Sequence, residues 1–155
     1  MKRLAIVMAA PLLVATTLAA SAAHAVFSIN EPWVRAGPGR HTAEVFMNLR
    51  SSDAAIVVAI DSFAARAVTI RASAPKGGGA RAETIALPAN TVVALTPASI
   101  RIRLDGLVRR LKSGEFVPLT LFVRGADGKE QKYFVNAEVR QHSPTDDERD
   151  AQAGG

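Results

Sequence analysis

The chain has 155 residues, which fits one domain, and a formal net charge of +5 at pH 7. It contains no Cys, so disulfide scaffolds, zinc ribbons and cysteine nucleophiles are excluded within this sequence. Aromatic residues make up 5% of the chain and hydrophobic residues 48%, so we expect a core built from small aliphatic side chains.

The first 25 residues have the pattern of a cleaved signal peptide. A basic start, Met1-Lys2-Arg3, precedes an uncharged apolar run over residues 4–20 and an Ala-His-Ala cleavage sequence that ends at Ala25. The apolar run is short for a transmembrane span. We therefore expect export to the periplasm, removal of residues 1–25 and no membrane span in the mature chain, which keeps 17 basic and 14 acidic residues.

Residues 26–142 have the pattern of one all-β domain. Short apolar or alternating runs recur between turn sequences, with no sustained helical period. The expected strands are 32–36, 42–50, 55–63, 67–72, 81–87, 91–95, 100–104, 116–124 and 131–139. About nine strands at this spacing predict an antiparallel sandwich or barrel. Asp127-Gly128 is the strongest hairpin turn, between the last two strands, and residues 107–112 could form a brief helical turn.

The last thirteen residues differ in composition from the rest. Residues 143–155 contain four acidic residues and one Arg, with no large apolar side chain to bury. This composition predicts a disordered acidic tail. Residues 26–142 keep 16 basic and 10 acidic residues, so the positive charge belongs to the domain.

Arginines alternate with aliphatic residues in one predicted strand. In residues 100–105, Arg101, Arg103 and Asp105 share one face, while the aliphatic residues between them share the core face. Arg71 repeats the pattern in another strand. Two interpretations stay open: a solvated face whose arginines pair with Asp105 or another acid, and a site for an anion or an acidic protein. Nucleic-acid binding is disfavoured because the aromatic residues that stack on bases are missing.

Catalytic motifs are scarce in the mature chain. Its two histidines, His41 and His142, stand in no sequence that supplies a nucleophile, a base or a metal-dependent hydrolase motif. We therefore do not expect an enzyme.

Several segments, in the same order, resemble the periplasmic copper chaperones called PCu(A)C. They are residues 31–36 (Glu-Pro-Trp-Val-Arg-Ala), 42–49, 85–89, 104–107 and 111–121. The last of these is similar to the family's L-x-x-G-x-x-x-P-L-T-L sequence. The resemblance covers roughly residues 29–140. It implies a cupredoxin-like antiparallel β-sandwich of Greek-key topology and a role in delivering Cu(I) to the dinuclear centre of cytochrome c oxidase.

The same resemblance implies a copper site, but its ligands are substituted. The family binds Cu(I) through His and Met side chains, which suit that ion. Its ligand positions fall here on Arg71, Gly79, Arg101 and Arg103. Arginine stays protonated and offers no lone pair to a metal. We therefore expect no bound cofactor. Copper binding is implied by the family resemblance alone.

Other potential copper ligands are few. Met47 is expected to pack in the core, His41 to lie in an exposed loop and His142 to begin the tail. Cleavage after Ala23 instead of Ala25 would also leave His24 at the new N-terminus.

Two hypotheses for function result. In the first, this exported PCu(A)C-like monomer handles copper through an unusual site, or contacts a periplasmic copper protein. In the second, it is a metal-free binding module whose Arg71, Arg101 and Arg103 recognise an anion or an acidic partner protein. An inert copy of the family fold is a third option.

Overall fold

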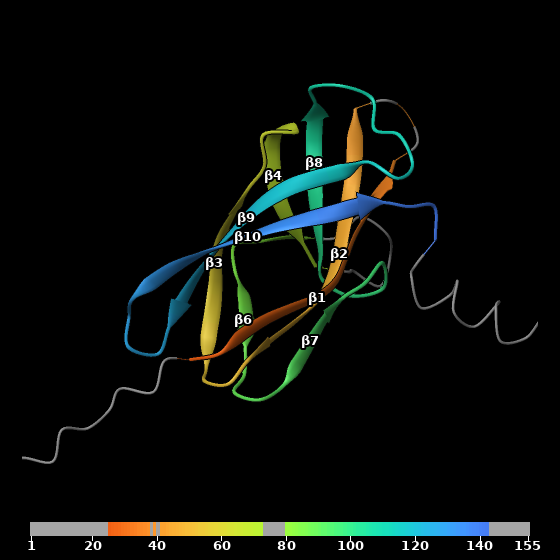
Figure 1. Cartoon of the computed structure of the whole chain (residues 1–155). Helices are drawn as coiled ribbons and strands as arrows, with labels where there is room; N and C mark the ends of the chain where they lie inside the picture. Colours follow the sequence, from red (N-terminus) through yellow and green to blue (C-terminus); the bar gives the residue numbers. More distant parts are fainter. Residues whose placement is uncertain (1–24, 38, 40, 73–79, 143–155) are drawn as a thin grey trace, which may run out of the picture.

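The computed structural model describes residues 25–37, 39, 41–72 and 80–142 (Figure 1). Nearly all of the expected signal peptide and the whole of the expected tail, residues 143–155, lie outside this part of the chain. The described residues form ten strands: β1 (Phe27–Ala36), β2 (Thr42–Ser51), β3 (Ala55–Asp61), β4 (Ala65–Arg71), β5 (Arg81–Ala82), β6 (Ile85–Leu87), β7 (Val92–Leu95), β8 (Arg101–Leu107), β9 (Phe116–Gly125) and β10 (Glu130–Val139).

The all-β prediction is confirmed, with local differences. The expected strand 81–87 is two strands, β5 and β6, because residues 83 and 84 leave the ladder. Strand β1 begins at Phe27, earlier than expected, because a bulge between Asn30 and Trp33 breaks the alternation that sequence patterns detect. The helical turn considered for residues 107–112 is wrong: Leu107 ends β8 and the residues after it form bends. None of the described residues lies in a helix, so none belongs to a helix able to span a membrane.

The strands join into one curved, barrel-like sheet. The hydrogen-bonded order is β5-β4-β8-β2-β1-β10-β9-β3-β6, and β7 pairs with β2. The pairs along this order are antiparallel except β1 with β10, which are parallel, with Val34 opposite Val139. Figure 1 shows β9 and β10 running across β8 and β2, so the two halves of the sheet face each other across the hydrophobic core.

Alternation along each strand builds the core. In β9, the buried residues are Val117, Leu119, Leu121 and Val123, and the residues between them face outward. Most of the core side chains are Val, Leu, Ile and Ala, as the composition predicts. The predicted Asp127-Gly128 turn joins β9 to β10: the Lys129 amide donates to Asp127 Oδ1 at 3.0 Å.

Candidate functional site

Arg71, Arg101 and Arg103 lie together on an outward face of the sheet. Strand β4 pairs with β8 so that Arg71 is opposite Arg101 and Thr69 is opposite Arg103. The residues that alternate with the β8 arginines, Ile102 and Leu104, are fully buried in the core. The adjacency that the anion hypothesis needs is therefore present.

A further arginine extends this group. Strand β5 places Arg81 opposite Arg71, so Arg81, Arg71 and Arg101 form one row across three neighbouring strands, which we call the arginine row. Like charges directly opposite each other destabilise a sheet. The arginine row therefore concentrates positive charge at a cost in stability.

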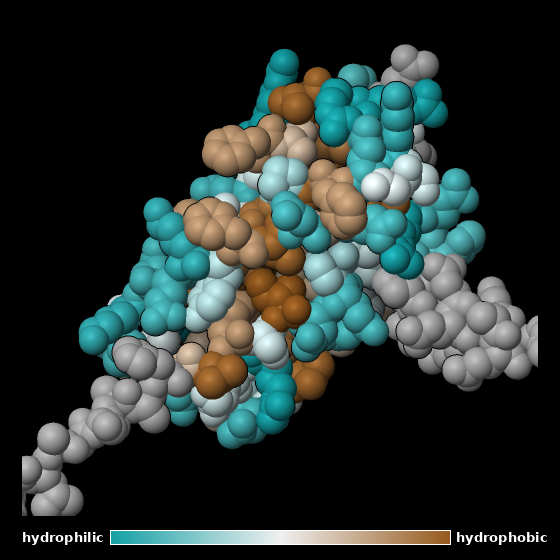
Figure 2. Space-filling view, in the orientation of Figure 1, coloured by the Kyte–Doolittle hydropathy of each residue, from teal (hydrophilic) through white to brown (hydrophobic). Residues whose placement is uncertain are grey.

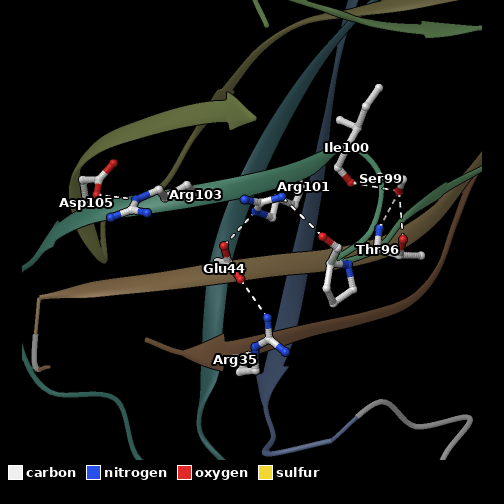
Figure 3. A network of polar contacts seen from close by, with 9 residues as sticks. Arg35, Glu44, Thr96, Ser99, Ile100, Arg101, Arg103 and Asp105 are labelled. Carbon is white, nitrogen blue, oxygen red and sulfur yellow. Dashed lines mark hydrogen bonds and ion pairs between the residues drawn. The ribbon is translucent and has the colours of Figure 1, made fainter. Parts of the chain in front are cut away.

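Two carboxylates hold part of this charge in place. Glu44 accepts a hydrogen bond from Arg101 Nε at 2.8 Å and another from Arg35 Nη2 at 2.9 Å (Figure 3). Arg101 Nη1 also donates to the Pro97 carbonyl at 3.3 Å. The Arg101 and Glu44 side chains are only 18% and 22% exposed, so this ion pair is shielded from water more than an ordinary surface pair.

Arg103 has its own partner two residues away on β8. Its Nε donates to Asp105 Oδ1 at 2.8 Å, and this hydrogen bond, with the charge of Asp105, raises the pKa of Arg103. The ion-pair interpretation is therefore confirmed for both β8 arginines, with Glu44 as the acid that pairs with Arg101.

The chemistry of this face opposes a cation. Guanidinium groups donate hydrogen bonds and carry a permanent positive charge, so they repel a metal ion. Within the described ranges, no group of three or more His, Cys, Asp or Glu residues could hold a metal ion. Gly79, the expected loop position of the family's ligand set, lies outside those ranges.

Comparison with family models matches residues 27–135 to the family described as LpqE-like. The chain belongs to the LpqE-like family. Comparison with curated proteins finds no match.

Solved structures similar to this LpqE-like protein carry the PCuAC fold. The copper-bound PCuAC domain from PmoF2 is 20% identical with a TM-score of 0.63, over 77% of this chain and 100% of that chain. The apo PCuAC domain from PmoF1 is 18% identical with a TM-score of 0.63, over 75% and 94%. Apo-DR1885 from Deinococcus radiodurans is 22% identical with a TM-score of 0.56, over 90% and 97%. The cupredoxin-like β-sandwich expected from the PCu(A)C resemblance is thereby confirmed.

The remaining candidate ligands of the LpqE-like domain lie in unlike surroundings. Met47 is 2% exposed and belongs to the core, as expected. His41 is exposed in the loop before β2, also as expected. His142 is exposed and lines a small pocket of about 220 Å³ beside Trp33 and Phe46.

Sequence reasoning missed Glu44, Arg35 and Arg81 as members of this site. Glu44 alternates with the buried Ala43 and Val45, which indicates that it faces outward on its strand. The alternation is a local signal and does not predict which strand lies beside Glu44. Its partner Arg101 is 57 residues away in the sequence.

Proposed function

We propose that this protein is an exported, metal-independent binding protein that recognises an anionic group of an acidic partner protein. The proposed binding surface is the face where the PCu(A)C resemblance places Cu(I). One observation carries the proposal: Arg71 is directly opposite Arg101, and Arg103 follows on the same face of β8. These are three of the positions that the PCu(A)C resemblance assigns to copper ligands.

The charge balance of the face supports an anionic partner. Five arginines gather there (Arg35, Arg71, Arg81, Arg101 and Arg103), and Glu44 and Asp105 pair with three of them, Arg35, Arg101 and Arg103. The guanidinium groups outnumber these two carboxylates, and they match carboxylates and phosphates in shape and charge.

The two carboxylates position the arginines and leave some of their N–H donors available for a ligand. Arg103 gives its Nε to Asp105 and is 40% exposed, so its terminal nitrogens, which carry four of the five N–H donors, are free to turn toward a ligand. Arg101 is held on two sides by Glu44 and Pro97, which lowers the conformational entropy that it would lose on binding.

Copper delivery is the competing function. The copper-bound domain from PmoF2 has the same fold, which favours copper as cargo. The residues here oppose it, because Arg71, Arg101 and Arg103 stand at the ligand positions of the resemblance. We therefore propose that the fold is kept as a binding scaffold, neither an enzyme nor a copper carrier, and that it acts as a monomer in the periplasm.

The test uses a fluorescein-labelled decaglutamate peptide as the probe, titrated with the purified mature protein. We expect binding that weakens steeply with added salt, because exposed charges are screened within about 10 Å at 0.1 M salt. The variant Arg101→Ser, Arg103→Ser should lose this binding.

A matched control removes two positive charges elsewhere. The variant Arg124→Ser, Lys129→Ser changes exposed residues near the β9–β10 hairpin and should keep most of the affinity. Equal losses in both double variants would show unspecific attraction to a basic protein and refute the proposed site. Binding by the native chain that is insensitive to salt would do the same.

A further inference from the structure

A groove unrelated to the arginine row lies on the outward face of β9 and β10. It has a volume of about 560 Å³ and extends to the β3–β4 turn and the first half of β4. Its lining includes Phe63, Arg66, Val68, Phe122, Lys132 and Phe134. A volume of this size lies within the range of about 300–1,000 Å³ typical of small-molecule sites.

Aromatic side chains are concentrated on this face. The chain has six Phe residues, and three of them, Phe63, Phe116 and Phe134, are 92%, 61% and 80% exposed. Phe122 and Phe116 alternate with the buried residues of β9, so they share its outward face. Figure 2 shows hydrophobic residues gathered on the side of the molecule where β9 and β10 lie in front. The outer face of an antiparallel sandwich is ordinarily polar, so such a patch indicates a binding surface.

Two cations border the aromatic lining. Lys132 is opposite Phe122, and its Nζ lies 5.3 Å from the centre of that ring. Arg66 contributes the second positive charge. In the described part of the chain neither forms an ion pair, although Arg101, Arg103 and four other arginines do. Asp61 is the one acidic residue of the lining, so the groove is net positive.

We infer that this groove binds a single-chain amphiphile with an anionic head, of the fatty-acid class. The apolar chain lies along β9 between Phe134 and Phe63, and the carboxylate lies at the Lys132 end, beside Phe122. The β9 residues that line the groove extend from Pro118 to Phe122, which is about 13 Å along the strand and accommodates an extended chain. A second copy of the protein is a poorer occupant, because a twofold contact on this face would bring like charges together.

The test is a titration of the mature protein with sodium dodecanoate below its micelle concentration, followed by calorimetry and by amide NMR shifts. We expect shifts confined to residues 61–68, 118–122 and 132–136. Dodecyltrimethylammonium has the same chain length and the opposite charge, and should bind about tenfold more weakly or worse.

Substitutions in the groove separate the two parts of the ligand. Phe63→Ser combined with Phe134→Ser should weaken dodecanoate binding by about tenfold or more, because two apolar contacts are lost. Lys132→Ser should weaken binding of dodecanoate and strengthen binding of the ammonium amphiphile, because a positive charge is removed from the groove. Phe116→Ser and Lys129→Ser are matched controls outside the groove and should change neither. All of these side chains are exposed, and thermal unfolding will verify that each variant folds.

Four results would overturn the inference. They are the absence of dodecanoate shifts in the groove, equal binding of the cationic amphiphile, a dimer in sedimentation that Phe134→Ser dissociates, and binding to anionic lipid vesicles without binding of monomeric dodecanoate.

Discussion

Glu44 is the residue on which the arrangement of the arginines depends. Its two oxygens bind Arg101 and Arg35, from the strands on either side of β2. Glu44→Gln should lower the free energy of unfolding by about 1–3 kcal/mol, because it leaves the largely buried Arg101 without its counter-ion next to other arginines. Urea unfolding measures the change.

Glu83→Gln is the control for this substitution. Glu83 is exposed and forms no ion pair among the described residues, so its replacement should cost almost nothing. If the two variants are equally stable, Glu44 does not hold the arginine face together.

Thr69 carries a buried hydroxyl beside the arginines. Its Oγ1 has no hydrogen-bond partner within the described part of the chain, and a buried unsatisfied hydroxyl is destabilising. Thr69→Val keeps the shape of the side chain and should raise the free energy of unfolding by about 1 kcal/mol. A lower melting temperature in this variant would show that the hydroxyl has a partner in solution.

Glu115 makes stability depend on pH. The Lys112 amide donates to its carboxylate at 3.0 Å and Arg109 at 2.7 Å, and these hydrogen bonds lower the pKa of Glu115. The stabilisation is present above the unfolded value of about 4.3 and disappears as pH falls through the lower, folded-state pKa. At pH 7 the native chain should have a higher free energy of unfolding than Glu115→Gln. This difference should disappear as the pH is lowered to 3. A difference in free energy of unfolding that does not change with pH would show that the Glu115 carboxylate is not its source.

At the scale of single strands, Gly106 fits β8 against β4. Its φ is +65°, a conformation that disfavours other residues, and a Cβ there would lie 3.1 Å from Arg66 Cβ. Gly106→Ala should destabilise the protein by about 1–3 kcal/mol. Gly114 has a φ of +84° with open space around it, so Gly114→Ala should cost less in the same thermal unfolding assay. Equal costs would mean that contact with Arg66 contributes nothing.

Strands with strict alternation were predictable, and strands defined by distant partners were not. The alternation in β8 and β9 and the Asp127-Gly128 turn are local signals, and the structure contains all three. The parallel pairing of β1 with β10 joins the two ends of the domain, and no local sequence encodes it. The same distinction holds at the site: Arg103 and Asp105 are two residues apart and were visible as a pair, whereas Arg101 meets Glu44 only through the register of β8 and β2.

At the scale of the whole molecule, one sandwich presents two surfaces of different chemistry. One surface is polar and positive, with arginines from β1, β4, β5 and β8. The other is a groove lined by phenylalanines of β9, β10 and the β3–β4 turn, of which Phe63 and Phe134 are exposed. The core between them consists mostly of aliphatic side chains, which explains how a chain with so few aromatic residues can leave three of its six phenylalanines exposed.

Titration of the mature protein with Cu(I) against a competing chelator shows whether the PCuAC fold of this chain carries copper. The variant Arg101→His, Arg103→Met is measured beside it; Glu44 keeps Arg35 as its partner in that variant. We expect the native chain to bind no Cu(I) and the variant to gain Cu(I) affinity, because His and Met replace guanidinium groups on a scaffold of the PCuAC fold. Tight stoichiometric Cu(I) binding by the native chain would refute a metal-independent function and indicate His24, His41 and His142 as ligands.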